Sequence, residues 1–173
     1  NKLIKSIHQK FPDSKIVVYG CYAQLEPEKI RNLDGVAAVI GTNEKFNLSD
    51  IIFEDKFNEL EKKPDIEDAK KFNISYSLSE RVRAFIKIQD GCNYNCSYCT
   101  IPNARGISRS FNIKNTVNSI KNIISNGAKE IVISGINIGD FGIEHNENLY
   151  GLLKEIDSLE NLYRYRISSI EPN

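Results

Sequence analysis

The sequence of 173 residues contains no methionine and begins with Asn1. We therefore expect that residue 1 is not a translation start. The sequence also lacks an apolar run long enough to span a bilayer, and no secretory signal peptide opens it. These absences predict no membrane partner, and the ordinary apolar content predicts a folded soluble protein.

Cysteine is scarce, and three of the four cysteines fall within eight positions. Cys92, Cys96 and Cys99 are spaced Cys-x3-Cys-x2-Cys. A disulfide framework does not fit, because thiols this crowded cannot pair sensibly. Thiolates on one short loop usually bind one metal centre instead. Free clustered cysteines also indicate a reducing compartment, so a cytoplasmic location is expected.

The number of clustered thiols helps to distinguish a zinc site from an iron–sulfur cluster. Structural zinc takes four ligands, and a fully protein-ligated 4Fe–4S cluster takes four cysteines. Three thiolates on such a cluster leave one iron open to a substrate or cofactor. The alternative is zinc completed by a distant cysteine or histidine, in a zinc-stabilised RNA-binding module without catalysis.

The formal net charge is zero, but the charges are unevenly distributed. The balance is −2 over residues 1–80, +7 over residues 81–129 and −5 over residues 130–173. The basic segment contains the clustered cysteines. Its charge fits either scattered lysines that compensate an anionic thiolate cluster or a docked polyanion such as RNA.

Residues 1–60 show alternating helix and strand patterns, which predict a parallel sheet with covering helices. The predicted elements are the tail of a helix over 3–11, a strand over 15–20, a helix over 27–33, a strand over 36–40 and a helix over 48–60. Residues 61–80 are charged, then Ser-rich, and lack periodicity, so we expect a linker there.

The remaining residues predict a strand–helix–strand–helix–strand order, which opens a (β/α) barrel. The predicted elements are a strand over 83–89, a helix from the cap Asn112 to Asn126-Gly127, a strand over 131–133, a helix over 149–159 and a strand over 163–170. Barrel active sites gather at the carboxyl ends of the strands. Three segments fall at those ends: the loop 90–112, Gly135–Gly139 and Ser168–Glu171. His8 and His145 are expected to be solvated.

Several stretches resemble a known family. The three-cysteine spacing is similar to that of radical S-adenosylmethionine (SAM) enzymes. The leading residues Arg83-Ala-Phe-Ile-Lys-Ile-Gln-Asp-Gly-Cys92 and the trailing residues Ile101-Pro-Asn-Ala-Arg-Gly106 and Arg109-Ser110 resemble the methylthiotransferases among them. That family inserts sulfur into an unactivated C–H bond and methylates it.

Two further stretches narrow the resemblance. Residues 131–142 and 166–172 most resemble the type that acts on threonylcarbamoyladenosine beside the tRNA anticodon. The isopentenyladenosine type and the enzyme that modifies a ribosomal protein are the alternatives. The resemblance also implies an electron donor of the flavodoxin or ferredoxin type, and we expect a monomer.

The resemblance implies two 4Fe–4S clusters. Cys92, Cys96 and Cys99 would hold one, and SAM would chelate its open iron. One electron would then cleave SAM to a 5′-deoxyadenosyl radical. Cys21, in the setting Gly20-Cys-Tyr-Ala-Gln24, would be the third ligand of an auxiliary cluster, with the other two ligands expected upstream of Asn1.

The resemblance also implies roles for other residues. Tyr98 would lie against the adenine of SAM. The other candidates for cofactor binding are Gly135, Asn137, Ser168 and Glu171. Arg105 and Arg109 are cationic and lie close to the cysteine loop in the sequence, which predicts contact with the SAM carboxylate or a substrate phosphate, or else salt bridges within the barrel.

The fold class implied is α/β. Residues 1–62 would be the C-terminal part of an N-terminal methylthiotransferase α/β domain that carries the auxiliary cluster. Residues 63–80 would be a linker. Residues 81–173 would be the first half of a radical SAM partial (β/α) barrel, with three of six strands. A fragment of this kind is expected to be inactive alone.

Overall fold

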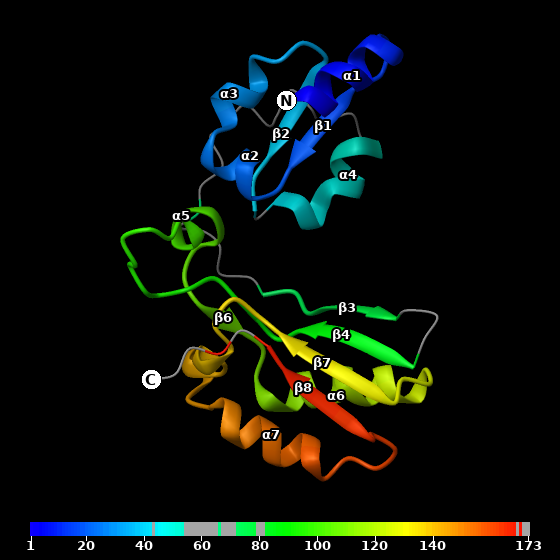
Figure 1. The fold of residues 1–173 in the computed structure, drawn as a ribbon, viewed down its shortest axis with the longest axis vertical. Helices are drawn as coiled ribbons and strands as arrows, with labels where there is room; N and C mark the ends of the chain where they lie inside the picture. Colours follow the sequence, from blue (N-terminus) through cyan, green and yellow to red (C-terminus); the bar gives the residue numbers. More distant parts are fainter. Residues whose placement is uncertain (43, 54–65, 67–71, 79–81, 169, 171–173) are drawn as a thin grey trace. The chain divides into compact units, whose positions relative to one another are not determined.

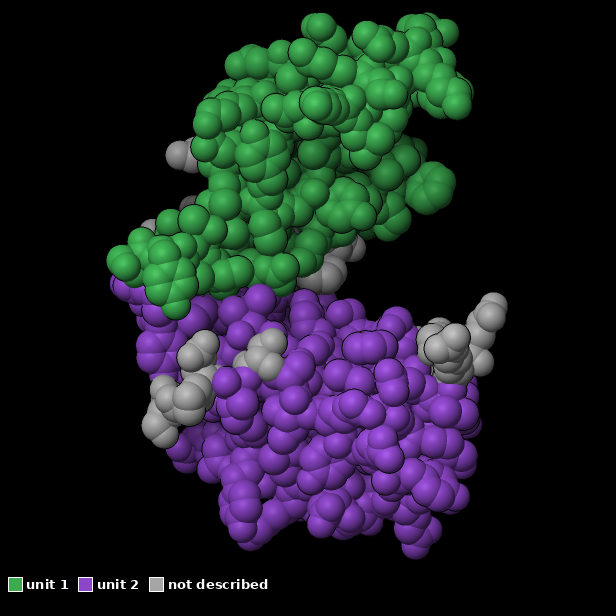
Figure 2. Space-filling view, viewed as in Figure 1, with its two compact units in different colours: residues 1–69, 97–106 green, residues 70–96, 107–173 purple. Residues whose placement is uncertain are grey.

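The computed structural model describes residues 1–42, 44–53, 66, 72–78, 82–168 and 170. The protein is a mixed α/β structure, as the sequence predicts. Its contacts divide the chain into two compact units (Figure 2). Unit 1 contains residues 1–69 and 97–106, and unit 2 contains residues 70–96 and 107–173.

In the part of the chain that the structure describes, no helix combines the length and the apolar character needed to cross a membrane.

Unit 1 is built on two parallel strands, β1 (Ile16–Tyr19) and β2 (Val36–Ile40), which confirms both predicted strands. Its helices are α1 (Lys2–Lys10), α2 (Cys21–Leu25), α3 (Pro27–Arg31), the 3-10 helix η1 (Glu44–Asn47), α4 (Leu48–Phe53) and α5 (Ile101–Arg105). A small core of Ala23, Ile30 and Val39 joins the strands to α2 and α3. Part of the predicted helix over 48–60 lies outside the described residues.

Unit 2 contains a four-stranded sheet in the order β3-β4-β7-β8 (Figure 1). The strands are β3 (Ser75–Leu78), β4 (Arg83–Lys87), β7 (Glu130–Ser134) and β8 (Arg164–Ile167). The last three are parallel, and β3 is antiparallel to β4. The expected linker over 63–80 was therefore wrong at β3, because the short Ser-Tyr-Ser-Leu alternation becomes a strand only when it pairs with the edge of β4.

Two helices cover one face of this sheet. They are α6 (Ile113–Ser125), which lies before β7, and α7 (Leu149–Asp157), which connects β7 to β8 (Figure 1). The alternation of β4 places Ala84 and Ile86 in the core and leaves Phe85 48% exposed. The helices contribute buried residues at helical spacing: Val117, Ile120, Ile123, Leu149, Leu152 and Ile156. Each fully buried aliphatic side chain contributes about 1.5–3 kcal/mol, so this core dominates the stability of unit 2.

Short elements lie at the carboxyl ends of the parallel strands. They are β5 (Gln89–Asp90), β6 (Arg109–Ser110) and the 3-10 helices η3 (Ile138–Asp140) and η4 (Ile143–His145). β5 and β6 pair in antiparallel fashion. The segment 90–112 was expected to be one long loop, and the structure instead closes its base with this pair. Asn112 caps α6 as predicted, since its Oδ1 accepts a hydrogen bond from Asn115 N at 2.8 Å.

Candidate metal centre

The three clustered cysteines lie between β5 and α5, in a segment without regular structure. Cys96 is exposed, Cys92 and Cys99 are half-buried, and all three are free thiols. By contacts, the segment through Cys96 belongs to unit 2, and residues 97–106 belong to unit 1. Among the described residues, no group of three or more Cys, His, Asp or Glu side chains is gathered tightly enough to hold a metal ion.

The base of the cysteine segment is closed within unit 2 by backbone and side-chain pairing. Gln89 pairs with Ser110, and Asp90 pairs with Arg109. Ser108 N donates a hydrogen bond to Asn93 Oδ1 at 2.9 Å. This contact joins a residue directly after Cys92 to the residue directly before β6.

Asp90 forms ion pairs with two basic side chains at the base of the cysteine segment. Its carboxylate lies 2.9 Å from Lys87 Nζ and 3.7 Å from Arg109 Nη2, and it accepts a hydrogen bond from Gly91 N at 3.0 Å. Arg109 is 4% exposed and also donates to Ile107 O. The salt bridge within unit 2, which the sequence left open as the alternative for Arg109, is therefore present.

The turn after β7 carries two of the predicted cofactor residues. Gly135 packs against Gln89, so closely that a Cβ atom at position 135 would lie 2.9 Å from Gln89 Oε1. Asn137 is 2% exposed, and neither polar atom of its side chain has a hydrogen-bond partner within the described part of the chain. A buried amide without a protein partner is costly, so Asn137 is a candidate for contact with water or with a ligand.

Asp140, which the sequence reasoning missed, follows Asn137 in η3. It is 6% exposed, and burial raises the pKa of its carboxyl. Asp140 N donates to Asn137 O at 3.1 Å, so the two residues belong to one tight turn. The structure therefore adds a buried carboxyl beside the predicted Asn137.

The other predicted residues are more scattered. Tyr98 is 88% exposed, and Arg105 is the last residue of α5 in unit 1. Ser168 follows β8, and its hydroxyl donates to Ile133 O at 3.1 Å. Glu171 lies outside the described residues.

Cys21 is the first residue of α2, and only Gly20 separates it from the end of β1, as expected for a residue at the carboxyl end of a parallel strand. Gln24 in the same helix is buried, and its Oε1 accepts a hydrogen bond from Thr42 N at 2.8 Å. Thr42 Oγ1 in turn donates to Ala104 O in α5 at 2.7 Å. Within unit 1, the helix that carries Cys21 therefore packs against the helix that follows Cys99.

His145 is exposed, as expected, and its Nε2 lies 3.1 Å from Ser110 O. His8 differs from the expectation, because it is half-buried and packs against Gly35. Sequence reasoning also gave no role to Gln89, Asp90 and Ser110, which are almost fully buried. The sequence feature that could have indicated them is their position, as polar residues beside an apolar strand or the cysteine motif.

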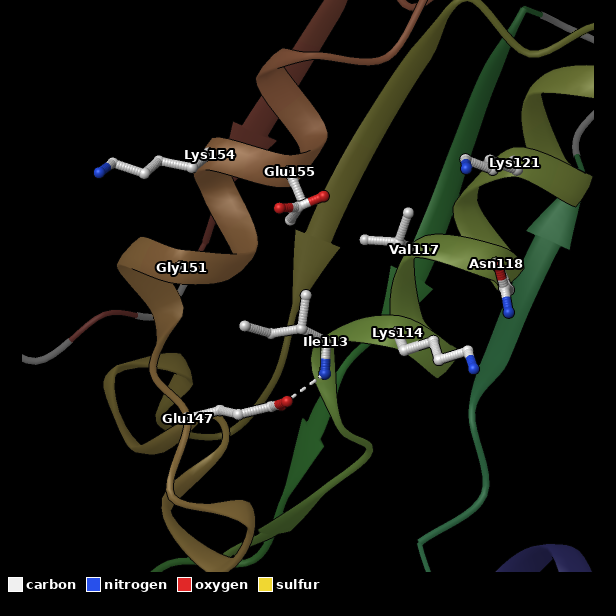
Figure 3. A pocket seen from close by; sticks show the side chains of 9 residues that line it. All are labelled: Ile113, Lys114, Val117, Asn118, Lys121, Glu147, Gly151, Lys154 and Glu155. Atoms are coloured by element: carbon white, nitrogen blue, oxygen red, sulfur yellow. Dashed lines mark hydrogen bonds between the residues drawn. The ribbon is translucent and has the colours of Figure 1, made fainter.

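A separate groove of about 520 Å³ lies between α6 and α7. Figure 3 shows its lining, which includes Lys114, Lys121 and Lys154. Glu147 Oε2 accepts a hydrogen bond from Ile113 N at 2.6 Å there and so caps the first turn of α6. No cysteine lines this groove, so it is distinct from the candidate metal centre.

Comparison with known proteins gives clear relatives, although no family model matches the chain. It is 37% identical to the threonylcarbamoyladenosine tRNA methylthiotransferase MtaB of Thermotoga maritima and 36% identical to MtaB of Bacillus subtilis, each over 98% of this chain. It is 32% identical, over 99% of its length, to the ribosomal protein uS12 methylthiotransferase RimO of Carboxydothermus hydrogenoformans. These matches cover 39%, 39% and 40% of the relatives, so the chain spans about two-fifths of their length.

The cysteine spacing at the end of a parallel strand and these matches together place the chain among the radical SAM proteins. Within that class, the chain belongs to the methylthiotransferase family over the residues that the matches cover.

Proposed function

We propose that the protein is a radical SAM enzyme that inserts sulfur into an adenosine of tRNA next to the anticodon and methylates it. The product would be the 2-methylthio derivative of threonylcarbamoyladenosine. The observation that carries this proposal is the identity of 36–37% to two MtaB proteins over 98% of the chain. The excess of basic residues over 81–129 supports a polyanionic substrate.

Cys92, Cys96 and Cys99 are the proposed ligands of a 4Fe–4S cluster. The donor set fits in number and chemistry, because such clusters take cysteine thiolates and all three thiols are free. A cluster bound there, with one iron free of cysteine, would supply the electron that cleaves SAM. The chain itself supplies the thiolates and closes the base of their segment with the β5–β6 pair.

SAM would be held by groups at the carboxyl ends of the strands. The unpartnered amide of Asn137 has a donor and an acceptor available, and Gly135 is the proposed contact from the same turn. Tyr98, directly before Cys99, would stack on the adenine with its exposed ring. Ser168 and Glu171 are the proposed contacts from the next strand.

Arg105 and Arg109 are proposed to act toward the substrate phosphates or the SAM carboxylate. Arg109 already pairs with Asp90. Its guanidinium has several N–H donors, so it can bind Asp90 and a phosphate or carboxylate at the same time.

We infer that residues 1–62 belong to a methylthiotransferase domain in which Cys21 binds an auxiliary cluster. Residues 63–80, which include the strand β3, would connect it to residues 81–173, the first half of a radical SAM barrel. Three parallel strands covered by helices on one face support this assignment. The opposite face carries Arg83 and Arg166, whose guanidinium groups share the carboxylate of Glu130. A flavodoxin- or ferredoxin-type protein would supply electrons, and the enzyme would act as a monomer.

The proposal is tested by anaerobic reconstitution with iron and sulfide and by nucleoside analysis of tRNA from cells that lack the gene. We expect a brown protein with four irons per cluster and the loss of 2-methylthio-threonylcarbamoyladenosine, with normal threonylcarbamoyladenosine, in the deletion strain. Stoichiometric zinc without iron uptake would support the zinc-stabilised RNA-binding module and overturn the proposal.

The relative RimO supports a second candidate, in which the substrate is a ribosomal protein. Mass spectrometry of protein uS12 and of tRNA nucleosides from the same deletion strain separates the two. Loss of a methylthio group from uS12 with unchanged tRNA would favour this second candidate. Loss of the isopentenyladenosine derivative alone would indicate the third substrate type.

A further inference from the structure

Gln89 is fully buried at the end of the strand that leads into the cysteine segment. Its amide oxygen accepts hydrogen bonds from Ile136 N and Asn137 N, both at 2.9 Å. Its amide nitrogen lies 2.7 Å from Gly91 O and 2.9 Å from Ser108 Oγ. Because two backbone N–H groups can only donate, the oxygen of the amide must face them, and this fixes the orientation of the side chain.

One side chain thus connects three segments of unit 2. Gly91 directly precedes Cys92, Ser108 directly precedes β6, and Ile136-Asn137 is the turn after β7. The side-chain amide has two N–H groups, and its two shortest contacts use both of them. The contact to Asp90 O, at 3.2 Å, is then secondary.

The hydrogen bonds of Gln89 restrict the orientation of two peptide units. Gly91 O belongs to the same planar peptide unit as the nitrogen and Cα of Cys92, so the bond from Gln89 restricts where Cys92 starts. In the same way, the bond from Asn137 N fixes the peptide unit that ends at the Asn137 Cα. Gly135 completes the packing, because a Cβ atom there would lie 2.9 Å from Gln89 Oε1.

We propose that Gln89 is a positioning residue that holds Cys92 at a fixed distance from the Gly135–Asn137 turn. The inference rests on the proposed function, in which Cys92 binds the cluster and the turn binds SAM. The hydrogen bonds of the Gln89 side chain go to groups of the protein itself. Gln89 would thereby set the distance between Cys92, the first proposed cluster ligand, and the turn that is proposed to bind SAM.

The test uses two substitutions that separate the two halves of the amide. Gln89→Met keeps the volume and removes both the donor and the acceptor. Gln89→Glu keeps the acceptor for Ile136 N and Asn137 N but places a carboxylate oxygen against Gly91 O. Leu152→Ala is the control, because Leu152 is a fully buried core residue of unit 2 on α7, outside the cysteine segment.

The first readout is the alkylation rate of each cysteine in the metal-free protein, measured by mass spectrometry. Both Gln89 variants should raise the rate at Cys92 by about tenfold, as expected for the loss of one buried hydrogen bond. Cys21, in unit 1, should be unchanged. An increase at Cys92 no larger than that of Leu152→Ala would show that Gln89 only stabilises the fold, which overturns the proposal.

The second readout is hydrogen exchange at the amides of Ile136 and Asn137. Gln89→Glu should preserve their protection, and Gln89→Met should remove it. Equal loss in both variants would contradict the division of roles between the two halves of the amide. If neither variant folds, Ser108→Ala removes one partner of Gln89 and should loosen Cys92 to a smaller extent, and no loosening would overturn the proposal.

The third readout is the electron paramagnetic resonance spectrum of the reconstituted protein. SAM should change the spectrum of the wild type strongly and that of Gln89→Met weakly, at equal iron content. If the wild type binds no cluster, the proposed function fails, whereas the alkylation and exchange results still decide the role of Gln89.

Discussion

Asp140 is a buried carboxyl whose folded-state pKa is raised by burial. The folded protein therefore binds this proton more tightly than the unfolded chain does. Its contribution to stability is fully present below the pKa of an unfolded aspartate, about 4, and is lost as the pH rises through the folded pKa. At neutral pH the ionised, desolvated carboxylate is a cost.

We predict that Asp140→Asn raises the melting temperature at neutral pH by a few degrees and that the gain disappears below about pH 4. Thermal unfolding followed by circular dichroism across this pH range measures the difference. A variant that is less stable than the wild type at neutral pH would contradict the prediction.

Glu130 shows the opposite behaviour. Burial raises its pKa, but the hydrogen bond from Arg83 and the charges of Arg166 and Arg83 outweigh this and hold the pKa below its usual value. Its Oε1 lies 2.7 Å from Arg166 Nε and 3.0 Å from Arg83 Nε. The stability from this cluster is present above the pKa of an unfolded glutamate, about 4.3, and is lost as the pH falls through the folded pKa.

We predict that Glu130→Gln lowers the melting temperature at neutral pH and has little effect at about pH 3. The reason is that the substitution leaves two arginines without their shared carboxylate. Glu26→Gln is the matched control, because the exposed pair of Glu26 with Lys29 is worth little. If both substitutions lower the melting temperature equally, the Glu130 cluster stabilises the protein no more than an exposed ion pair does.

At the scale of single residues, the sequence predicted the roles that depend on neighbouring positions in the chain. The cap at Asn112 follows from the residue type next to a helical pattern. Gln89 could not be found this way, because its partners lie up to 48 positions away. The salt bridge of Arg109 likewise depends on the pairing of β5 with β6, and the sequence offered it only as one of two alternatives.

At the scale of elements, α5 is held within unit 1 by a specific contact. Thr42 Oγ1 donates to Ala104 O at 2.7 Å, and both groups are buried. We predict that Thr42→Val, which keeps the shape and removes the donor, lowers the free energy of unfolding by about 1–3 kcal/mol. Hydrogen exchange in residues 101–106 should accelerate at the same time.

Thr116→Val is the control for this prediction. Thr116 Oγ1 donates within its own helix, to Asn112 O at 3.0 Å, so its loss should not affect α5. If residues 101–106 exchange equally fast in the wild type and in Thr42→Val, the contact does not hold the helix.

The long strands and helices were predictable because their apolar residues repeat regularly. The elements β4, α6, β7, α7 and β8 all have such repeats and were predicted in order. The elements β3, β5 and β6 were not, because β5 and β6 have only two residues each and β3 lies in a Ser-rich stretch without an apolar pattern. They form only when a neighbouring strand supplies the hydrogen bonds.

At the scale of the whole molecule, the two cysteine sites should be separable in the full-length enzyme. We predict that alanine at Cys92, Cys96 or Cys99 abolishes SAM cleavage. Alanine at Cys21 should leave cleavage to 5′-deoxyadenosine intact but abolish transfer of the methylthio group to RNA. Liquid chromatography of both products measures this. Normal thiolation by the Cys21→Ala enzyme would show that Cys21 is a structural residue and that there is no auxiliary cluster on it.

The contact between Gly135 and Gln89 also constrains how the protein can evolve. A side chain at position 135 needs the space that Gln89 Oε1 fills, 2.9 Å from the site of its Cβ. A shorter residue at position 89 would remove only this one contact, because the added Cβ atom would also lie 3.1 Å from both the Cβ and the backbone oxygen of residue 89. Among related sequences we therefore expect glycine to persist at position 135 whichever residue stands at position 89, although the two positions are 46 apart in the chain.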